Sequence, residues 1–134
     1  MKKILTILFV AVIAIGLSSC KKTYITPNPN RTIIYDVPVS SWVLSDDGRS
    51  YFSVLDDIPE IDSYLNENGG VLVYFNFNQG VYEQIPYTYN GVSYSYTHET
   101  GNIVIYAQTS NGVTPVKPNA LKVKILLIDS DEVN

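Results

Sequence analysis

The chain has 134 residues, and nine Lys and Arg residues against thirteen Asp and Glu residues give it a formal net charge of −4 at pH 7. Its basic residues form no patch with interleaved aromatic side chains, which excludes the usual signature of a nucleic-acid-binding protein. A single cysteine excludes a disulfide within the chain, so the fold depends on its hydrophobic core alone.

The first residues have the layout of a secretory signal peptide. Lys2 and Lys3 precede an uncharged run from Ile4 to Leu17, which small residues follow. The run is too short for a transmembrane helix, which needs ~20 apolar residues. Because no polar stripe breaks the run, a buried helix of a globular domain is the weaker interpretation. Removal of residues 1–19 also removes both lysines and leaves a formal charge of −6.

The only cysteine lies directly after this run. Leu17-Ser18-Ser19-Cys20 resembles the lipobox of bacterial lipoproteins, in which an aliphatic residue and two small residues precede the cysteine. The resemblance implies cleavage before Cys20, lipid attachment to its thiol and acylation of the new amino terminus. Several acyl chains hold a protein on a membrane far more firmly than one chain does. The alternative is a free or intermolecularly paired thiol in a secreted protein.

Residues 20–31 are predicted to form a tether. The segment is polar and carries Pro27 and Pro29, a composition that favours extended, semi-rigid conformations. No acidic cluster follows Cys20, and in lipoproteins of the Bacteroidota such a cluster is associated with export to the cell surface. We therefore expect an outer-membrane lipoprotein that faces the periplasm.

Residues 32–134 show period-two patterning with frequent turn signals, which predicts an all-β fold, a single antiparallel β-sandwich of about seven strands. The expected strands are Thr32–Val39, Ser50–Leu55, Val71–Phe77, Val81–Tyr89, Val92–Glu99, Asn102–Thr109 and Leu121–Ile128. One short helix is expected before Gly69, with Ile58, Ile61 and Leu65 on one face.

Asn90-Gly91 is the strongest hairpin signal, because both positions of such a two-residue turn need positive φ. A second turn is expected at Thr100-Gly101. The two turns fix a three-stranded register: Tyr89 with Val92, Tyr87 with Tyr94, Ile85 with Tyr96, Glu83 with His98, Tyr96 with Ile105, and His98 with Ile103. Pro86 cannot donate to a ladder, which predicts an edge strand at 81–89.

This register assigns the two faces of the meander. The predicted core face carries Ile85, Tyr87, Tyr89, Val92, Tyr94, Tyr96, Ile103 and Ile105. Tyr82 and Tyr106 fall on the opposite face, which is rich in hydroxyl groups. They form a candidate binding surface together with the loops near Trp42, and each residue has a structural alternative. A single tryptophan in a small β domain is usually a core anchor, and tyrosine also suits a solvated β face.

Catalytic and metal sites receive little support. A catalytic triad built on His98 and Glu83 would need a nucleophile. Ser93 does not fit that role, because it lies on a hairpin strand and its motif lacks the second glycine of a nucleophile elbow. One histidine and a lipidated cysteine do not make a zinc set. Asp46-Asp47-Gly48 and residues 129–132 offer oxygen ligands for calcium but lack EF-hand spacing. We expect no catalytic residue, cofactor or metal.

The order of motifs resembles small, uncharacterised Bacteroidota lipoproteins with a single β-sandwich domain. The landmarks are Ser41-Trp42, Asp57-Ile58-Pro59-Glu60-Ile61, Gly70-Val71-Leu72-Val73-Tyr74, Ile85-Pro86-Tyr87 and Leu121-Lys122-Val123-Lys124. Tyr82 stands where a second tryptophan is expected. The resemblance implies fold and location, and it implies no activity.

Three functions remain open at this point. The first is a non-catalytic envelope module that binds a protein or carbohydrate. The second is a structural subunit that adds strands along the predicted edge at 81–89. The last is a hydrolase that uses His98 and Glu83.

Overall fold

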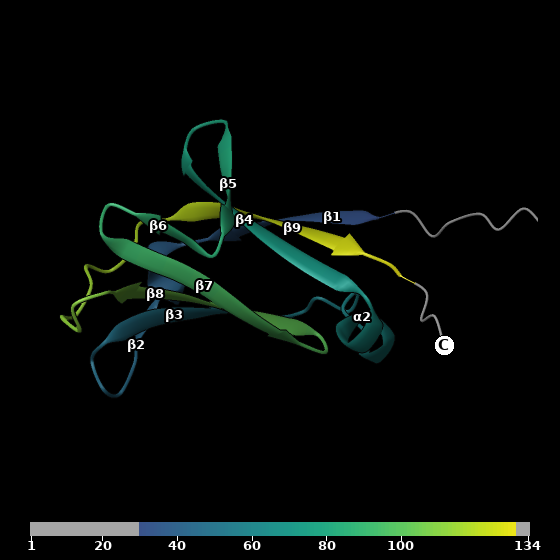
Figure 1. Cartoon of the computed structure of the whole chain (residues 1–134), viewed down its shortest axis with the longest axis horizontal. Helices are drawn as coiled ribbons and strands as arrows, with labels where there is room; N and C mark the ends of the chain where they lie inside the picture. Colours follow the sequence, from purple (N-terminus) through teal and green to yellow (C-terminus); the bar gives the residue numbers. More distant parts are fainter. Residues whose placement is uncertain (1–29, 131–134) are drawn as a thin grey trace, which may run out of the picture.

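The computed structural model describes residues 30–130, so the predicted signal peptide, Cys20 and nearly all of the predicted tether lie outside the described residues. Two antiparallel sheets pack as a sandwich, with strand orders β1-β9-β4-β5 and β2-β3-β8-β7-β6 (Figure 1). The elements are β1 (Arg31–Val37), η1 (Val39–Ser41), β2 (Val43–Leu44), β3 (Ser50–Leu55), α2 (Ser63–Asn68), β4 (Gly70–Asn78), β5 (Val81–Ile85), β6 (Tyr87–Tyr89), β7 (Val92–Glu99), β8 (Asn102–Thr109) and β9 (Leu121–Ile128). Within this part of the chain, no helix is long and apolar enough to cross a bilayer.

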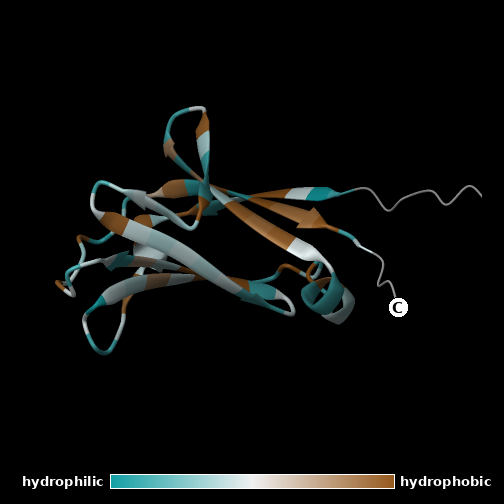
Figure 2. Ribbon diagram, viewed as in Figure 1, coloured by the Kyte–Doolittle hydropathy of each residue, from teal (hydrophilic) through white to brown (hydrophobic). Residues whose placement is uncertain are grey.

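The core lies between the sheets and is built by alternate residues of the central strands, as period-two patterning requires. These side chains are almost fully buried: Val71, Val73 and Phe75 of β4, Ile103, Ile105 and Ala107 of β8, and Val123, Ile125 and Leu127 of β9. Figure 2 shows the hydrophobic stretches on β4 and β9, whereas β7 is mostly near neutral. β7 contributes the ring of Tyr94 to the core, β9 contributes aliphatic side chains, and β4 contributes two valines and Phe75.

The predicted sandwich is confirmed, and four of the predicted strands, β3, β7, β8 and β9, have the expected bounds. β1 begins at Arg31, one residue before the predicted boundary, and ends at Val37 because Pro38 follows. The two-residue strand β2 was not foreseen, since two residues are too few to show a period.

The prediction of one strand over 81–89 is wrong. The chain changes sheets at the cis Ile85-Pro86 bond, where proline has no N–H to continue a ladder. β5 pairs with β4 in one sheet, with Glu83 opposite Phe75, whereas β6 pairs with β7 in the other. The expected pairings of Ile85 with Tyr96 and of Glu83 with His98 are therefore absent. Both strands are nevertheless edge strands, as Pro86 predicted.

The rest of the meander follows the predicted register. Asn90 and Gly91 both have positive φ, at 49° and 78°, and the turn pairs Tyr89 with Val92 and Tyr87 with Tyr94. The β7–β8 pairs also agree: Tyr96 with Ile105 and His98 with Ile103. Four members of the predicted core face are buried, and three pack against the core while partly buried: Ile85, Tyr94, Ile103 and Ile105, and then Tyr89, Val92 and Tyr96. Tyr87 is 42% exposed because β6 forms the rim of its sheet.

The helix is shorter than predicted. Asp62 caps α2 by accepting a hydrogen bond from the Leu65 amide at 2.8 Å, and the helix ends before Gly69. Ile58 and Ile61 are buried as expected, but they lie in a turn that precedes the helix. That turn exchanges backbone hydrogen bonds with Gly101: the Ile58 amide donates to its carbonyl at 3.0 Å, and its amide donates to the Ile61 carbonyl at 2.8 Å.

Side chains close the side of the sandwich between β4 and β7. The Tyr96 hydroxyl donates to the Val71 carbonyl at 2.6 Å, which joins the two sheets. Burial raises the pKa of Tyr96, and the neighbouring Tyr74 raises it further. Farther along β7, His98 Nδ1 lies 2.9 Å from Asn66 Oδ1, a contact that attaches α2 to the five-stranded sheet.

Candidate functional site

The structure separates the two tyrosines that the sequence placed on one surface. Tyr82 lies on the outer face of β5, where its ring and that of Tyr74 each lie 4.5 Å from Lys124 Nζ. Tyr106 lies on the outer face of β8, opposite Phe52 of β3. Since the outer faces of the two sheets of a sandwich point in opposite directions, Tyr82 and Tyr106 do not form one surface.

Trp42, the third predicted contact residue, is only 1% exposed. Its ring belongs to the core cluster, which is the structural alternative that the sequence offered. Its indole Nε1 is buried and has no hydrogen-bond partner within residues 30–130. The ring can therefore support the neighbouring loops, but it presents no face to a ligand.

His98 and Glu83 are not brought together. Glu83 is on β5 in the four-stranded sheet, and His98 is on β7 next to Asn66 of α2. Ser93 Oγ lies 3.0 Å from Thr88 Oγ1 on the outer face of the five-stranded sheet. The three groups that a hydrolase would need thus have separate neighbours, and the His98 ring is oriented by a hydrogen bond in which the Asn66 side-chain oxygen is the acceptor.

The acidic turn at 46–48 has a structural role. Asp47 Oδ1 accepts hydrogen bonds from Ser45 Oγ at 2.6 Å and from the Arg49 amide at 3.0 Å. The hydrogen bond from Ser45, followed by that from the Arg49 amide, lowers the pKa of Asp47. Within residues 30–130, His, Cys, Asp and Glu side chains form no group of three that could hold a metal ion.

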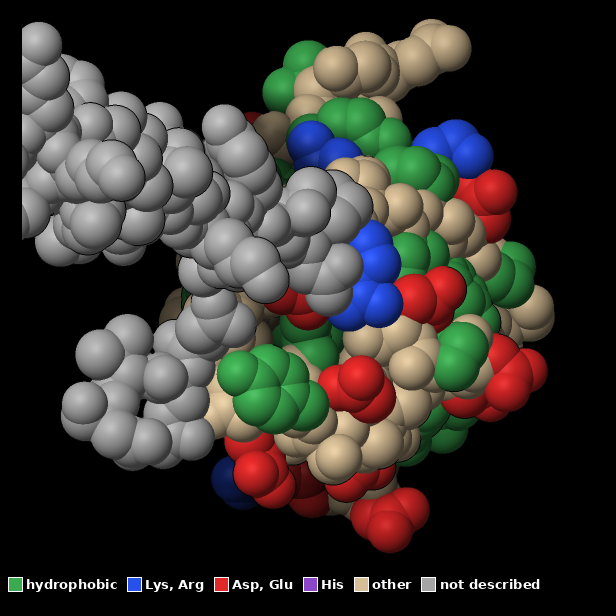
Figure 3. Space-filling model, turned by 90° about the vertical axis from the view of Figure 1, so that its right-hand side faces the viewer, with side chains coloured by type: hydrophobic (Ala, Val, Ile, Leu, Met, Phe, Trp, Pro, Cys, Tyr) green, Lys and Arg blue, Asp and Glu red, His purple; other side chains and the backbone are tan. Residues whose placement is uncertain are grey.

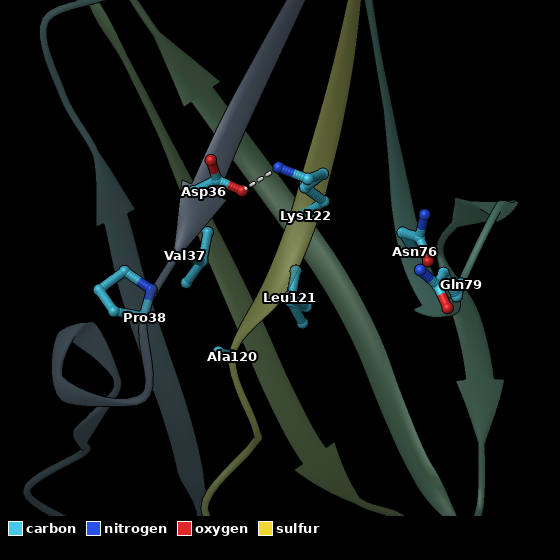
Figure 4. A pocket seen from close by; sticks show the side chains of 8 residues that line it. All are labelled: Asp36, Val37, Pro38, Asn76, Gln79, Ala120, Leu121 and Lys122. Carbon is cyan, nitrogen blue, oxygen red and sulfur yellow. Dashed lines mark hydrogen bonds and ion pairs between the residues drawn. The ribbon is translucent and has the colours of Figure 1, made fainter.

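A cleft lies at the end of the sandwich opposite α2, and the sequence did not predict it. We call it the end cleft. Its inner pocket, of about 350 Å³, is lined by Asn76, Phe77, Tyr89, Asn90, Val92, Tyr94, Val116, Lys117, Pro118, Asn119, Ala120 and Leu121. Its outer groove, of about 640 Å³, is lined by Asp36, Val37, Pro38, Asn76, Gln79, Ala120, Leu121 and Lys122 (Figure 4). The two parts adjoin, because Asn76, Ala120 and Leu121 line both. Each volume lies in the usual range of ligand sites, ~300–1,000 Å³.

An aromatic cluster forms one wall of the inner pocket. The rings of Phe77 and Tyr89 stack with 4.5 Å between centroids, and Tyr94 packs 4.9 Å from Phe77. The β4–β5 register shifts between Phe75 and Asn78, an irregularity of the kind that re-aims side chains at sheet edges. Burial raises the pKa of Tyr94, with a further contribution from Tyr89.

The segment between β8 and β9 forms the facing wall. It has no regular secondary structure from residue 114 to residue 120, and its Pro115 and Pro118 are buried. Thr114 Oγ1 donates to the Gly48 carbonyl at 2.6 Å, which attaches the segment to the β2–β3 turn. Lys117 and Asn119 are exposed on this segment and line the pocket. The two buried prolines hold this loop in place, and its Lys117 and Asn119 side chains supply polar groups to the pocket that the aromatic cluster also lines.

The end cleft differs in charge from the rest of the molecule. Of the thirteen acidic residues of the chain, only Asp36 is among the described residues that line it, and Lys122 Nζ pairs with that carboxylate at 2.5 Å. Lys117 adds a second cation, and no described residue of the inner pocket is acidic. Figure 3 shows acidic side chains spread over the opposite end, around α2. An acidic protein therefore carries a cationic cleft at one end.

Sequence reasoning missed this site because its walls come from segments that are distant along the chain. Phe77, Tyr89 and Tyr94 were interpreted as strand and core residues, and their strand positions are correct. The only local signal was the run from Val113 to Ala120, which has two prolines and no strand period between the predicted strands 102–109 and 121–128.

No protein-family model, no curated protein and no solved structure matches this chain. The fold and the end cleft therefore stand as the basis on which a function is proposed.

Proposed function

We propose that this protein is a lipid-anchored, non-catalytic binding module of the bacterial cell envelope, and that its ligand occupies the end cleft. The inner pocket is the observation that carries the proposal. Its aromatic cluster offers apolar contact area, and the amides of Asn76, Asn90 and Asn119 offer hydrogen-bond donors and acceptors. The lipobox-like Leu17-Ser18-Ser19-Cys20 supports the anchor and the envelope location.

The chemistry of the lining favours binding over turnover. A general acid–base pair needs two titratable groups near the reacting atoms, and the inner pocket offers tyrosines and one lysine among its described residues. His98, the only histidine, pairs with Asn66 at the α2 end. The end cleft and the only imidazole therefore lie at opposite ends of the sandwich.

The binding site can be tested by NMR on ¹⁵N-labelled chain from Lys21 to Asn134. Titration with a defined panel of saccharides, short peptides and fatty acids should shift the amides of Phe77, Tyr89, Asn90 and Lys117 for at least one probe. Tyr89→Leu should weaken that binding, whereas the matched Tyr106→Leu on the outer face of β8 should not. Shifts that cluster at Tyr82 or Tyr106 would move the site, and a panel without any shift would refute it.

The anchor is tested separately in cells. Wild-type protein should take up labelled palmitate and fractionate with the outer membrane, and Cys20→Ser should abolish both. Ser18→Ala, which keeps a small residue in the lipobox, is the control that should leave lipidation unchanged. Palmitate on the Cys20→Ser chain would contradict the anchor. Protease should reach the domain only in permeabilised cells if it faces the periplasm.

A second function, edge-to-edge assembly, is supported by β1. Of the four edges, β2 has two residues, β6 has three, and β5 ends at Pro86, whereas β1 pairs with β9 over all seven residues without a bulge. Such a regular edge is a template for another strand. Ile34, 50% exposed on β1, is the position to change. Concentration-dependent dimers that Ile34→Lys abolishes would support assembly, and a monomer at all concentrations would remove it.

A further inference from the structure

We propose that the ligand of the end cleft is an acidic saccharide, whose sugar rings pack on the aromatic cluster and whose carboxylate pairs with Lys117. This inference rests on the proposed function, because it names the class of ligand for the same cleft. Three properties of the lining carry it: aromatic rings beside amides, a cationic balance, and two adjoining compartments.

The combination of rings and amides selects a ligand that is apolar on its faces and polar on its rim. The faces of a sugar ring are C–H surfaces that can pack on the partly exposed rings of Phe77 and Tyr89, which the buried Tyr94 supports from behind, and its hydroxyls lie around the rim. The asparagine side chains that hydrogen-bond within residues 30–130 are all at positions outside the cleft. The amides of Asn76, Asn90 and Asn119 are therefore available to hydroxyl groups. An acyl chain would desolvate these amides without replacing their hydrogen bonds.

The charge of the cleft selects an anion. Within residues 30–130 the ion pairs are Arg31 with Asp129 and Lys122 with Asp36, and neither includes Lys117. A lysine on the rim of an acid-free pocket attracts a carboxylate. Many acidic side chains lie at the α2 end (Figure 3), and those of Asp46 and Asp47 lie outside the pocket lining, on the β2–β3 turn that Thr114 contacts. A neutral sugar would leave Lys117 without a role in binding.

The two compartments provide room for more than one sugar unit. The inner pocket and the outer groove share Asn76, Ala120 and Leu121, so a chain can pass from one to the other. In Figure 4, Asn76 and Gln79 lie across the outer groove from Asp36 and Pro38. We place the acidic unit in the inner pocket, next to Lys117, and a second unit in the groove, where Gln79 offers a further amide.

Two disaccharides that differ only at C6 of each sugar unit test the proposal. α-1,4-linked digalacturonate and α-1,4-linked galactobiose have the same linkage, but the first carries carboxylates where the second carries hydroxymethyl groups. Isothermal titration of the chain from Lys21 to Asn134 at low salt should show tighter binding of digalacturonate. Lys117→Met should weaken it about fivefold, the worth of one exposed ion pair, and should leave galactobiose nearly unchanged. Added salt should weaken digalacturonate alone.

Control variants separate this inference from the proposed function. Lys124→Met removes a lysine of the same type outside the cleft and should change neither affinity. Because Lys117 is exposed, Lys117→Met and Lys117→Glu should both fold, which thermal unfolding checks. Equal binding of both disaccharides, or indifference to Lys117, would overturn the acidic class and leave the cleft as a site. Binding of octanoate or of the peptide Gly-Asp-Gly instead would overturn the saccharide class. If none of the four probes binds, the inference fails.

Discussion

Replacing Tyr96 by phenylalanine removes one oxygen atom and with it the hydrogen bond that joins the two sheets at Val71. The donor–acceptor distance is 2.6 Å, and the contact is partly buried between β7 and β4. A hydrogen bond of this kind contributes ~1 kcal/mol net, and a carbonyl left without a partner costs ~1–3 kcal/mol. Partial exposure places the expected loss at about 1–2 kcal/mol of unfolding free energy, or roughly 5–10 °C in Tm for a domain of this size.

Urea unfolding followed by fluorescence of Trp42 measures this loss. Trp42 is the only tryptophan and is buried in the core, so its emission reports global unfolding. Tyr87→Phe is the matched control, because Tyr87 is 42% exposed and its hydroxyl makes no hydrogen bond within residues 30–130. The Tyr96→Phe midpoint should fall with an unchanged m-value, while the control stays at wild type. Equal midpoints for both variants would refute the role of Tyr96 in joining the sheets.

Three further outcomes are expected. Gly69→Ala places a Cβ 2.8 Å from two backbone carbonyl oxygens and should cost about 2 kcal/mol or more in chemical denaturation, whereas Gly70→Ala meets only side-chain atoms from 3.4 Å and should cost less. Burial raises the folded-state pKa of Tyr94, so the unfolded chain loses its proton first and stability should fall as pH rises above about 10. Tyr94→Phe should flatten that alkaline decline, and an unchanged decline would contradict it. His98→Ala removes the contact with Asn66 at the α2 end, so it should lower the midpoint slightly and leave cleft affinities unchanged.

Much of the fold could be predicted from local chemistry. The Asn90-Gly91 turn needs positive φ at both positions, which fixed the β6–β7 register, and period-two patterning located β8 and β9. The prediction failed at Pro86, where one apparent strand divides between two sheets. Its side-chain alternation continues on both sides of the proline, so the sequence carries no local sign that the partner strand changes.

The candidate site was harder to predict than the fold. Tyr82 and Tyr106 share a face only if 81–89 is one strand, and that assumption failed with the strand. Lys117 lines the same pocket as the aromatic cluster, and its loop is attached through Thr114 and two buried prolines. No sequence period encodes such contacts between segments. Residues that meet only through tertiary packing are invisible to a search for spaced motifs.

The direction of β1 has a consequence for how the protein would meet its surroundings. β1 begins at Arg31 near the α2 end and reaches the outer groove at Val37, about 20 Å away along seven residues. If Cys20 carries the lipid, the chain enters the domain at the end that is farthest from the cleft. The point where the tether joins the domain and the cleft would then be separated by the length of the sandwich. The junction with the tether would not obstruct a ligand that approaches the cleft.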